Sequence, residues 1–239
     1  TTINASGSQT LSSGGSASLT TINSAGIQIV SSGGRATLTT INSGGVQNIS
    51  SGGSATLTTI NARGVQNVSS GGKSMQITQN SGGNVNVTIR GGDRATVVSG
   101  TNESGSFSLA SGSASGFVIN SGGTQIVSSG GIASSTTINI GGAQNVNNSG
   151  SAVLTTINAG GSQTVRLAAK ASSTTINSGG KQTVFSGGTA TMTLINGGEQ
   201  ILSSGGSATS TKISAGGIQT VSVGAKSTQI TQNSGGTVN

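Results

Sequence analysis

Side chains that could carry out acid–base or metal chemistry are scarce in this chain. It contains no His and no Cys, and its only acidic residues are Asp93, Glu103 and Glu199. Neither a Ser-His-Asp nor a Cys-His nucleophile can be assembled, and a metal site could draw only on these carboxylates. Asp93 and Glu103 lie in the one irregular segment and form the only candidate pair for glycoside hydrolysis, which uses two neighbouring carboxylates. Because scattered acids in a loop are usually solvated, we predict no enzyme, no metal and no cofactor.

Basic residues outnumber acidic ones by ten to three, which gives a formal net charge of +7. Half of them occupy the slot after a Gly-Gly pair, which we therefore expect to be exposed: Arg35, Lys73, Arg94, Lys170 and Lys226. Such a column could attract an anionic surface, and it could equally serve solubility. Because the charge is sparse and three Phe are the only aromatic residues, we predict that the chain does not bind nucleic acid.

The elements that position these residues repeat about every 19 positions. The phrase Thr-Thr-Ile-Asn leads into a Gly-rich bend, then Gln-x-Val, Ser-Ser-Gly-Gly and x-Ala. A fixed period indicates one structural unit stacked on itself, and period-2 patterns rich in Thr and Val favour short strands. Copies can pair in parallel with their neighbours, and parallel crossovers are nearly always right-handed. We predict an all-β fold, a right-handed parallel β-helix (solenoid) with about 19 residues per coil and about 12 coils.

We expect residues 1–239 to form a single β-helix fragment of a longer chain. Lys73–Asn86 and Lys226–Asn239 are near copies, and the second stops where the first continues. The rhythm breaks between about 84 and 118, where extra residues predict irregular coils or a protruding loop. A missing residue in Asn196–Glu199 predicts a tightened bend.

Four columns of equivalent residues are expected to face inward. The Val column is always apolar, the Ala column is always small, the Ile column precedes each bend, and the Gln column lies two residues before Val on the same face. Stacked Gln and Asn amides one strand apart can bond each other along the axis. We interpret both amide columns as structural.

The serines after Val are expected to point outward, because the same slot elsewhere holds Asn147, Arg166 and Phe185. These turn-start serines are Ser12, Ser31, Ser50, Ser69, Ser128, Ser203 and Ser222. The serines that follow them share their slot with Leu167 and Val223, so we expect them to turn inward. These second serines are Ser13, Ser32, Ser51, Ser70, Ser129, Ser186 and Ser204.

The unit TTINSGGVQNISSGGSATL, from Thr39 to Leu57, resembles the 19-residue repeat of AIDA-type autotransporter adhesins. The resemblance covers nearly the whole chain and is weakest from about 84 to 116. It implies an extracellular passenger domain on a bacterial surface, anchored in the outer membrane by a C-terminal barrel outside this chain. It also implies adhesion to a host-cell surface receptor, self-aggregation and biofilm formation. Some members are O-glycosylated on Ser with heptose by a dedicated protein O-heptosyltransferase.

If the resemblance extends to the modification, the acceptors are exposed serine hydroxyls. The turn-start serines are the first candidates. The second group consists of the serines that follow the Gly-Gly pairs: Ser16, Ser54, Ser151 and Ser207. The third group consists of the serines at the other bends: Ser24, Ser43, Ser121 and Ser178. Decoration is expected to be uneven, because some coils lack the first-choice hydroxyl.

Two other functions remain open at this stage. The solenoid could associate with other copies of itself without any sugar. It could also bind ice, because a regular ladder of threonines recurs, although Lys212 and several shifts interrupt it. This ladder comprises Thr21, Thr40, Thr59, Thr137, Thr156 and Thr175.

Overall fold

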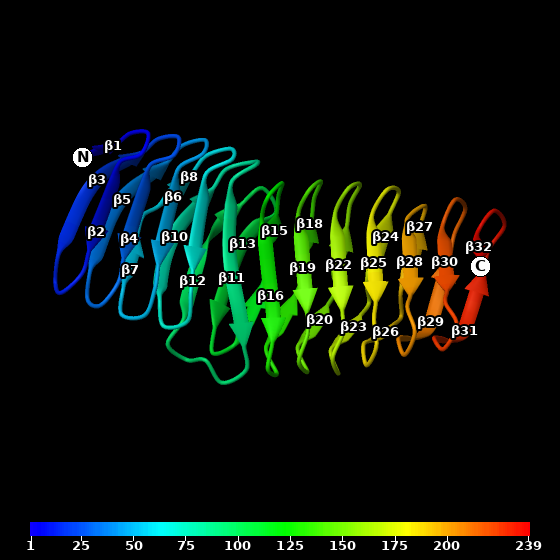
Figure 1. The fold of residues 1–239 in the computed structure, drawn as a ribbon. Coiled ribbons are helices and arrows are strands. Elements are labelled where there is room, and N and C mark those ends of the chain that lie inside the picture. Colours follow the sequence, from blue (N-terminus) through cyan, green and yellow to red (C-terminus); the bar gives the residue numbers. More distant parts are fainter. The chain divides into compact units, whose positions relative to one another are not determined.

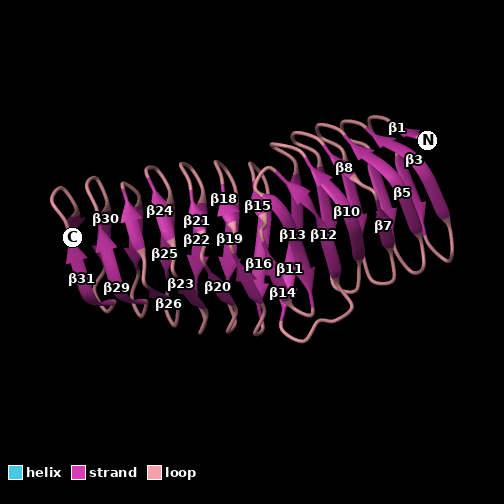
Figure 2. Ribbon diagram, turned by 180° about the vertical axis from the view of Figure 1, so that it is seen from behind, coloured by secondary structure: helices cyan, strands magenta, loops and turns pink.

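The computed structural model describes all residues from 1 to 239, and its regular structure consists of 32 strands (Figure 1). Strands and their connecting loops make up the whole fold (Figure 2). No helix in the structure is long and apolar enough to cross a membrane.

The strands stack as a parallel β-solenoid of about 12 turns with about 19 residues per coil, which confirms the predicted all-β solenoid and its coil length. Thr2 pairs with Thr21, and Gln9 pairs with Gln28, so neighbouring coils are in register with the repeat. The register follows from the inward apolar columns, because a slip of one residue would turn each buried side chain outward.

The chain divides into two compact units, the first comprising Thr1–Thr88 and Gly92–Gly123 and the second Ile89–Gly91 and Thr124–Asn239. In the first unit, two runs of strands form opposite walls of the coils. One wall contains β1 (Thr2–Ile3), β3 (Ser16–Ile22), β5 (Arg35–Ile41), β7 (Ser54–Thr56), β8 (Thr59–Ile60), β10 (Lys73–Gln79) and β12 (Val97–Asn102). The other contains β2 (Ser8–Leu11), β4 (Ile27–Val30), β6 (Val46–Ile49), β9 (Val65–Val68) and β11 (Asn84–Arg90), whose last residues belong to the second unit.

An antiparallel insertion interrupts the first unit. β12 pairs antiparallel with β13 (Gly105–Ala110), and β13 pairs antiparallel with β14 (Ser113–Ser115), before β15 (Val118–Ile119) resumes the repeat. Glu103 and Ser104 form the turn of this hairpin. This antiparallel strand pair lies within the segment of about 84–118 for which the sequence predicted irregular coils or a protruding loop.

The second unit repeats the same coil without an insertion. Its first wall contains β17 (Ile132–Ser134), β18 (Thr137–Ile138), β20 (Ser151–Val153), β21 (Thr156–Ile157), β23 (Lys170–Ser172), β24 (Thr175–Asn177), β26 (Thr189–Thr191), β27 (Leu194–Asn196), β29 (Ser207–Ile213) and β31 (Lys226–Gln232). Its second wall contains β16 (Thr124–Ser128), β19 (Ala143–Val146), β22 (Ser162–Val165), β25 (Lys181–Val184), β28 (Glu199–Leu202), β30 (Ile218–Val221) and β32 (Thr237–Val238).

The predicted inward columns form the core of both units. Val30, Ile41 and Ala55 are fully buried, as are their equivalents in most coils. Each buried Val or Ile side chain contributes on the order of 1.5–3 kcal/mol by leaving water. The exceptions are Gln9 and Ala17 in the first unit and Val221 in the second, which are half-buried.

The predicted amide ladders are present and run along the solenoid axis. Within the buried Gln column, Gln47 Nε2 donates to Gln28 Oε1 over 2.6 Å, and Gln66 Nε2 donates to Gln47 Oε1 over 2.7 Å. The Asn column at the bends repeats the pattern, with Asn42 Nδ2 donating to Asn23 Oδ1 over 2.9 Å. These bonds satisfy buried amides that would otherwise destabilise the core, and they hold the turns of successive coils one above another.

The Gln ladder also continues without a break through the coil in which the sequence lacks one residue. Gln200 Nε2 donates to Gln182 Oε1 over 2.6 Å, although the two residues are 18 positions apart. The bend at Gly197 therefore absorbs the deletion, as predicted, and leaves the inward columns in place.

Candidate functional site

Each Ser-Ser-Gly-Gly segment forms a tight turn that closes one end of a coil. In the first coil, the N–H of Gly15 donates to the carbonyl of Ser12 over 2.8 Å, so Ser12 is the first residue of the turn and Ser13 is the second. Ser13 and Gly14 both have positive φ, at 51° and 84°. This pair of values defines a type I′ turn, in which the two central residues project away from the strands.

Glycine ends this turn in most coils for a steric reason, although Ala169 and Ala225 fill the slot in two of them. A Cβ added to Gly53 would lie 2.1 Å from the carbonyl oxygen of Val30 in the preceding coil. The Gly-Gly pairs therefore allow the coils to approach one another closely, and no helix follows them that could make them a phosphate site.

The second serines of the turns are exposed, and the prediction that they turn inward is wrong. The largest apolar residues in this slot are exposed too, Leu167 at 54% and Val223 at 96%. The expected alternation of inward and outward residues holds along a strand, but this slot lies at the tip of a turn. We call the seven serines there the turn-tip serines: Ser13, Ser32, Ser51, Ser70, Ser129, Ser186 and Ser204.

The turn-tip serines also have free hydroxyl groups, with one exception. Ser70 Oγ donates to Asp93 Oδ2 over 3.0 Å. No hydrogen bond within the chain engages the hydroxyl of Ser32, Ser51 or the other turn-tip serines. The strand context gave no sign of their exposure, but the turn chemistry of Ser-Gly between two strands could have indicated it.

The turn-start serines differ among themselves in exposure. Ser12, Ser69 and Ser222 are exposed, whereas Ser31, Ser50 and Ser203 are half-buried. Ser128 is only 6% exposed, so its predicted exposure is wrong. Strand β16 extends to Ser128, one residue beyond the point where the equivalent strands end.

The serines of the second group lie on the wall strands, after the Gly-Gly pairs. Ser16 is exposed, and Ser54, Ser151 and Ser207 are half-buried. The serines at the opposite bend, Ser24, Ser43, Ser121 and Ser178, are all exposed.

One of the five residues that we predicted in the basic column lies outside it. Lys73 pairs with Val97, so Val97 and not Arg94 occupies the slot in that coil. Arg94 lies in the irregular segment before β12. Arg35, Lys73, Lys170 and Lys226 are exposed as expected.

Asp93, the first of the two candidate catalytic acids, holds the irregular segment together. Its carboxylate accepts hydrogen bonds from Thr96 Oγ1 at 2.7 Å, from Ser70 Oγ at 3.0 Å and from the backbone N–H of Ala95 and Thr96. Partial burial alone would raise the pKa of Asp93, but these hydrogen bonds outweigh it and hold the pKa below its ordinary value. A lowered pKa is the opposite of what a general acid for glycoside hydrolysis needs.

Comparisons with known proteins agree with this geometry. The sequence family described as "Adhesin of bacterial autotransporter system, probable stalk" matches residues 99–161. A crystal structure of a TibC-catalysed, hyper-glycosylated TibA fragment is 42% identical in sequence, covers 99% of this chain and 94% of that chain, and gives a TM-score of 0.54. No curated protein sequence matches the chain.

The chain belongs to the AIDA-type autotransporter adhesins. Its repeats are those of a passenger stalk, and such passengers are typically not enzymes. In the TibA fragment, the glycosylation is attributed to TibC. For the adhesin described here, the exposed serines at both turns are therefore the candidate functional surface.

Proposed function

We propose that this chain is the stalk of an adhesin passenger, exposed on the bacterial surface, whose turn-tip serines carry O-linked heptose. A protein O-heptosyltransferase comparable to TibC would attach the sugars. The observation that carries the proposal is the column of exposed serines at the turn tips, most of them with a hydroxyl that no other group of the chain engages.

A glycosyltransferase needs an acceptor hydroxyl on a backbone segment that its active site can reach. A serine at the second position of a tight turn meets both conditions, because the turn projects beyond the strands that support it. The turn-tip serines therefore rank first, followed by the exposed Ser12, Ser16, Ser69 and Ser222. The exposed bend serines follow, and Ser128 ranks last because it is buried.

The stacked coils repeat this acceptor at a spacing of about 4.8 Å per strand. A surface that repeats one weak contact many times gains avidity, because each bound contact raises the effective concentration of the next. The proposed outcome is adhesion to a host-cell receptor, self-aggregation and biofilm formation. Sugars over the turns would also protect backbone from pairing with other chains.

The decisive experiment compares the chain produced with and without the heptosyltransferase. Intact mass should increase by multiples of one heptose unit, and fragmentation should place most sugars on turn-tip serines. Joint replacement of Ser32 and Ser51 by Ala should remove up to two sugars. The matched control, Ser128→Ala, should leave the number of sugars unchanged. An unmodified mass in the presence of the transferase would refute the proposal.

The adhesive role requires a separate measurement. Bacteria that display the sugar-bearing chain should adhere to host cells and aggregate more than bacteria that display the sugar-free chain in equal amount. Equal adhesion of both would show that the sugars do not carry the function.

Self-association without sugar is a second candidate, and an apolar column supports it. Leu19, Leu38 and Leu57 lie at the same position of consecutive coils with positive φ, and all three side chains are exposed, Leu19 by 69%. Replacing all three by Ser, which stands at the equivalent position as Ser135 and Ser173, should abolish any dimer seen by sedimentation of the sugar-free chain.

Ice binding has less support. The predicted threonine ladder is half-buried. In the two coils after Thr175, the same position holds Leu194 and then Lys212. An ice-binding surface needs a flat exposed array, and the thermal hysteresis of the purified chain would test it. We also propose no enzymatic role, because the carboxylate of Asp93 accepts hydrogen bonds that hold the irregular segment together.

A further inference from the structure

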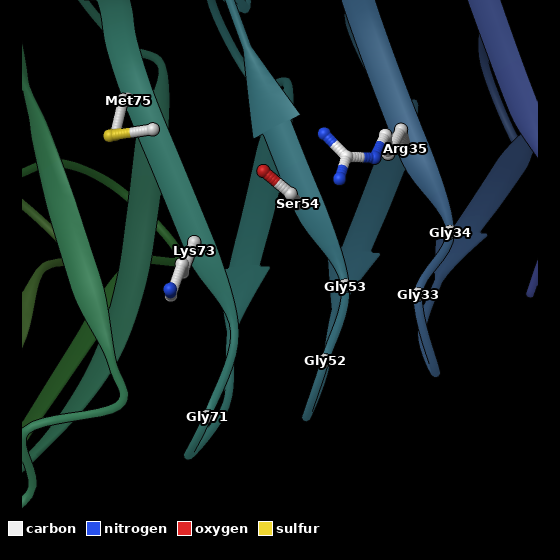
Figure 3. A pocket seen from close by; sticks show the side chains of 9 residues that line it. All are labelled: Gly33, Gly34, Arg35, Gly52, Gly53, Ser54, Gly71, Lys73 and Met75. Atoms are coloured by element: carbon white, nitrogen blue, oxygen red, sulfur yellow. The ribbon is translucent and has the colours of Figure 1, made fainter. Parts of the chain in front are cut away.

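A groove in the first unit lies against the turns of three consecutive coils (Figure 3). It has a volume of about 340 Å³. Its floor is formed by glycines of the turns, and its side chains come from the first residues of strands β5, β7 and β10 and from Met75, the third residue of β10. The lining residues are Gly33, Gly34, Arg35, Gly52, Gly53, Ser54, Gly71, Lys73 and Met75.

Two cations flank this groove with one serine between them. Arg35 pairs in register with Ser54, and Ser54 pairs in register with Lys73. The two backbones are therefore two strands apart, or roughly 10 Å. Figure 3 shows the guanidinium of Arg35 extending toward the strand that carries Ser54.

Both cations lack a counter-charge within the chain. The ion pair between Lys181 and Glu199, at 3.4 Å, involves neither of them. The side chains of Arg35 and Lys73 are exposed and make no hydrogen bond to the rest of the chain. An anion in the groove could therefore contact both without displacing an existing partner.

The fold itself does not require these charges. Equivalent slots hold Val97 in the first unit and Ile132 and Thr189 in the second. By contrast, the glycines of the floor are explained by the turns, as shown above for Gly53. The fold gives no reason for the placement of Arg35 and Lys73 on either side of Ser54.

The chemistry of the lining indicates the class of ligand. A guanidinium binds carboxylate, sulfate or phosphate through two parallel hydrogen bonds, and an ammonium and a hydroxyl add further donors. The partly exposed Met75 side chain and the glycine floor offer a flat surface for the C–H face of a sugar ring. No aromatic residue lines the groove for base stacking, and two cations are few for a membrane surface.

We infer that the groove between Arg35 and Lys73 binds an acidic saccharide through its carboxylate or sulfate groups. The size of the groove lies at the lower end of small-ligand sites, which suits one or two sugar rings. This binding does not depend on glycosylation of the chain, so the sugar-free protein is the appropriate material for a test.

The second unit supplies a matched control at Lys170. Lys170 stands in the same slot as Lys73, between Ser151 and Thr189. The residues two strands away are Ile132 and Ser207, so Lys170 has no second cation across a serine. Replacing Lys170 therefore removes the same charge from the same kind of position without touching the groove.

The experiment measures binding of a heparin-derived tetrasaccharide to the sugar-free chain by calorimetry, with a neutral tetrasaccharide of glucose for comparison. Arg35→Gln and Lys73→Gln should each weaken binding at least tenfold, and Lys170→Gln should change it less than twofold. Ser54→Ile should also weaken binding at least tenfold by covering the floor, and the fold should accept it because Ile132 occupies the equivalent slot. Thermal unfolding checks that each variant is folded.

Three results would overturn the inference. The first is a loss of affinity in Lys170→Gln equal to that in Lys73→Gln, which would indicate diffuse charge attraction. The second is equal binding of the neutral tetrasaccharide. The third is binding to vesicles that contain anionic phosphatidylglycerol, but not to the acidic tetrasaccharide, which would assign the groove to a membrane surface.

Discussion

The buried Gln ladder provides the sharpest test of how the coils are held together. Gln163 is 1% exposed. Its Nε2 donates to Gln144 Oε1 over 2.6 Å, and its Oε1 accepts from Gln182 Nε2 over 2.6 Å. Replacement of Gln163 by Met keeps a side chain of similar length and removes both hydrogen bonds.

The expected cost follows from the two neighbours that lose their partner. Each buried polar group left without its main hydrogen bond costs about 1–3 kcal/mol, so the two together cost about 2–6 kcal/mol. Gln144 Oε1 keeps a contact of 3.4 Å with Thr155 Oγ1, and Gln182 Nε2 keeps one of 3.3 Å with Thr174 Oγ1. These long bonds and the added apolar burial of Met offset about 1–2 kcal/mol. We expect a net loss of about 1–4 kcal/mol.

The matched control is Thr164→Ile on the same strand. Thr164 points outward and is half-buried, and Ile201 stands in the same column. This change should alter the free energy of unfolding by less than about 0.5 kcal/mol.

Urea unfolding followed by circular dichroism measures the global effect. Because a solenoid can open locally between neighbouring repeats, hydrogen exchange of the amides in β19, β22 and β25 should be measured as well. Exchange there should accelerate in Gln163→Met and stay unchanged in Thr164→Ile. Equal stability and equal exchange in the two variants would refute a stabilising role of the ladder.

Three further predictions concern the core, a position of positive φ within strand β5 and the irregular segment. Ala171→Leu should destabilise the chain by about 1–3 kcal/mol through overpacking of the narrow interior, measured by urea unfolding, whereas Ser172→Val should be neutral because Val153 fills that position in the preceding coil. Leu38 has a φ of 57°, so Leu38→Val should cost about 1 kcal/mol more than Leu38→Ser, because β-branched residues are strained there; equal melting temperatures would contradict this. The lowered pKa of Asp93 means that its contribution to stability is fully present above about pH 5 and is lost as the pH falls through the folded pKa. Asp93→Asn should therefore flatten the acid side of the profile of melting temperature against pH, and an unchanged profile would exclude this role.

The candidate functional surface was only partly predictable from sequence. The exposed turn-start serines Ser12, Ser69 and Ser222 were identified by the varied residues that share their slot. The more accessible turn-tip serines were assigned to the interior, because Leu167 and Val223 occur among them. Apolar character predicts burial along a strand, but it gives no such signal at the tip of a turn, where the backbone leaves the wall of the coil.

The repeat by itself determined the fold class, the coil length and the side chains that face inward. It did so because every coil has the same neighbours, so that one inward Val, Ala, Ile or Gln implies all the others. The tertiary structure alone decided the features that differ between coils: the antiparallel insertion around β13, the burial of Ser128, the slot taken by Val97 in place of Arg94, and the groove that Arg35 and Lys73 flank. These features depend on the register between neighbouring coils and on the direction in which each turn projects, and a residue pattern read along one chain contains neither.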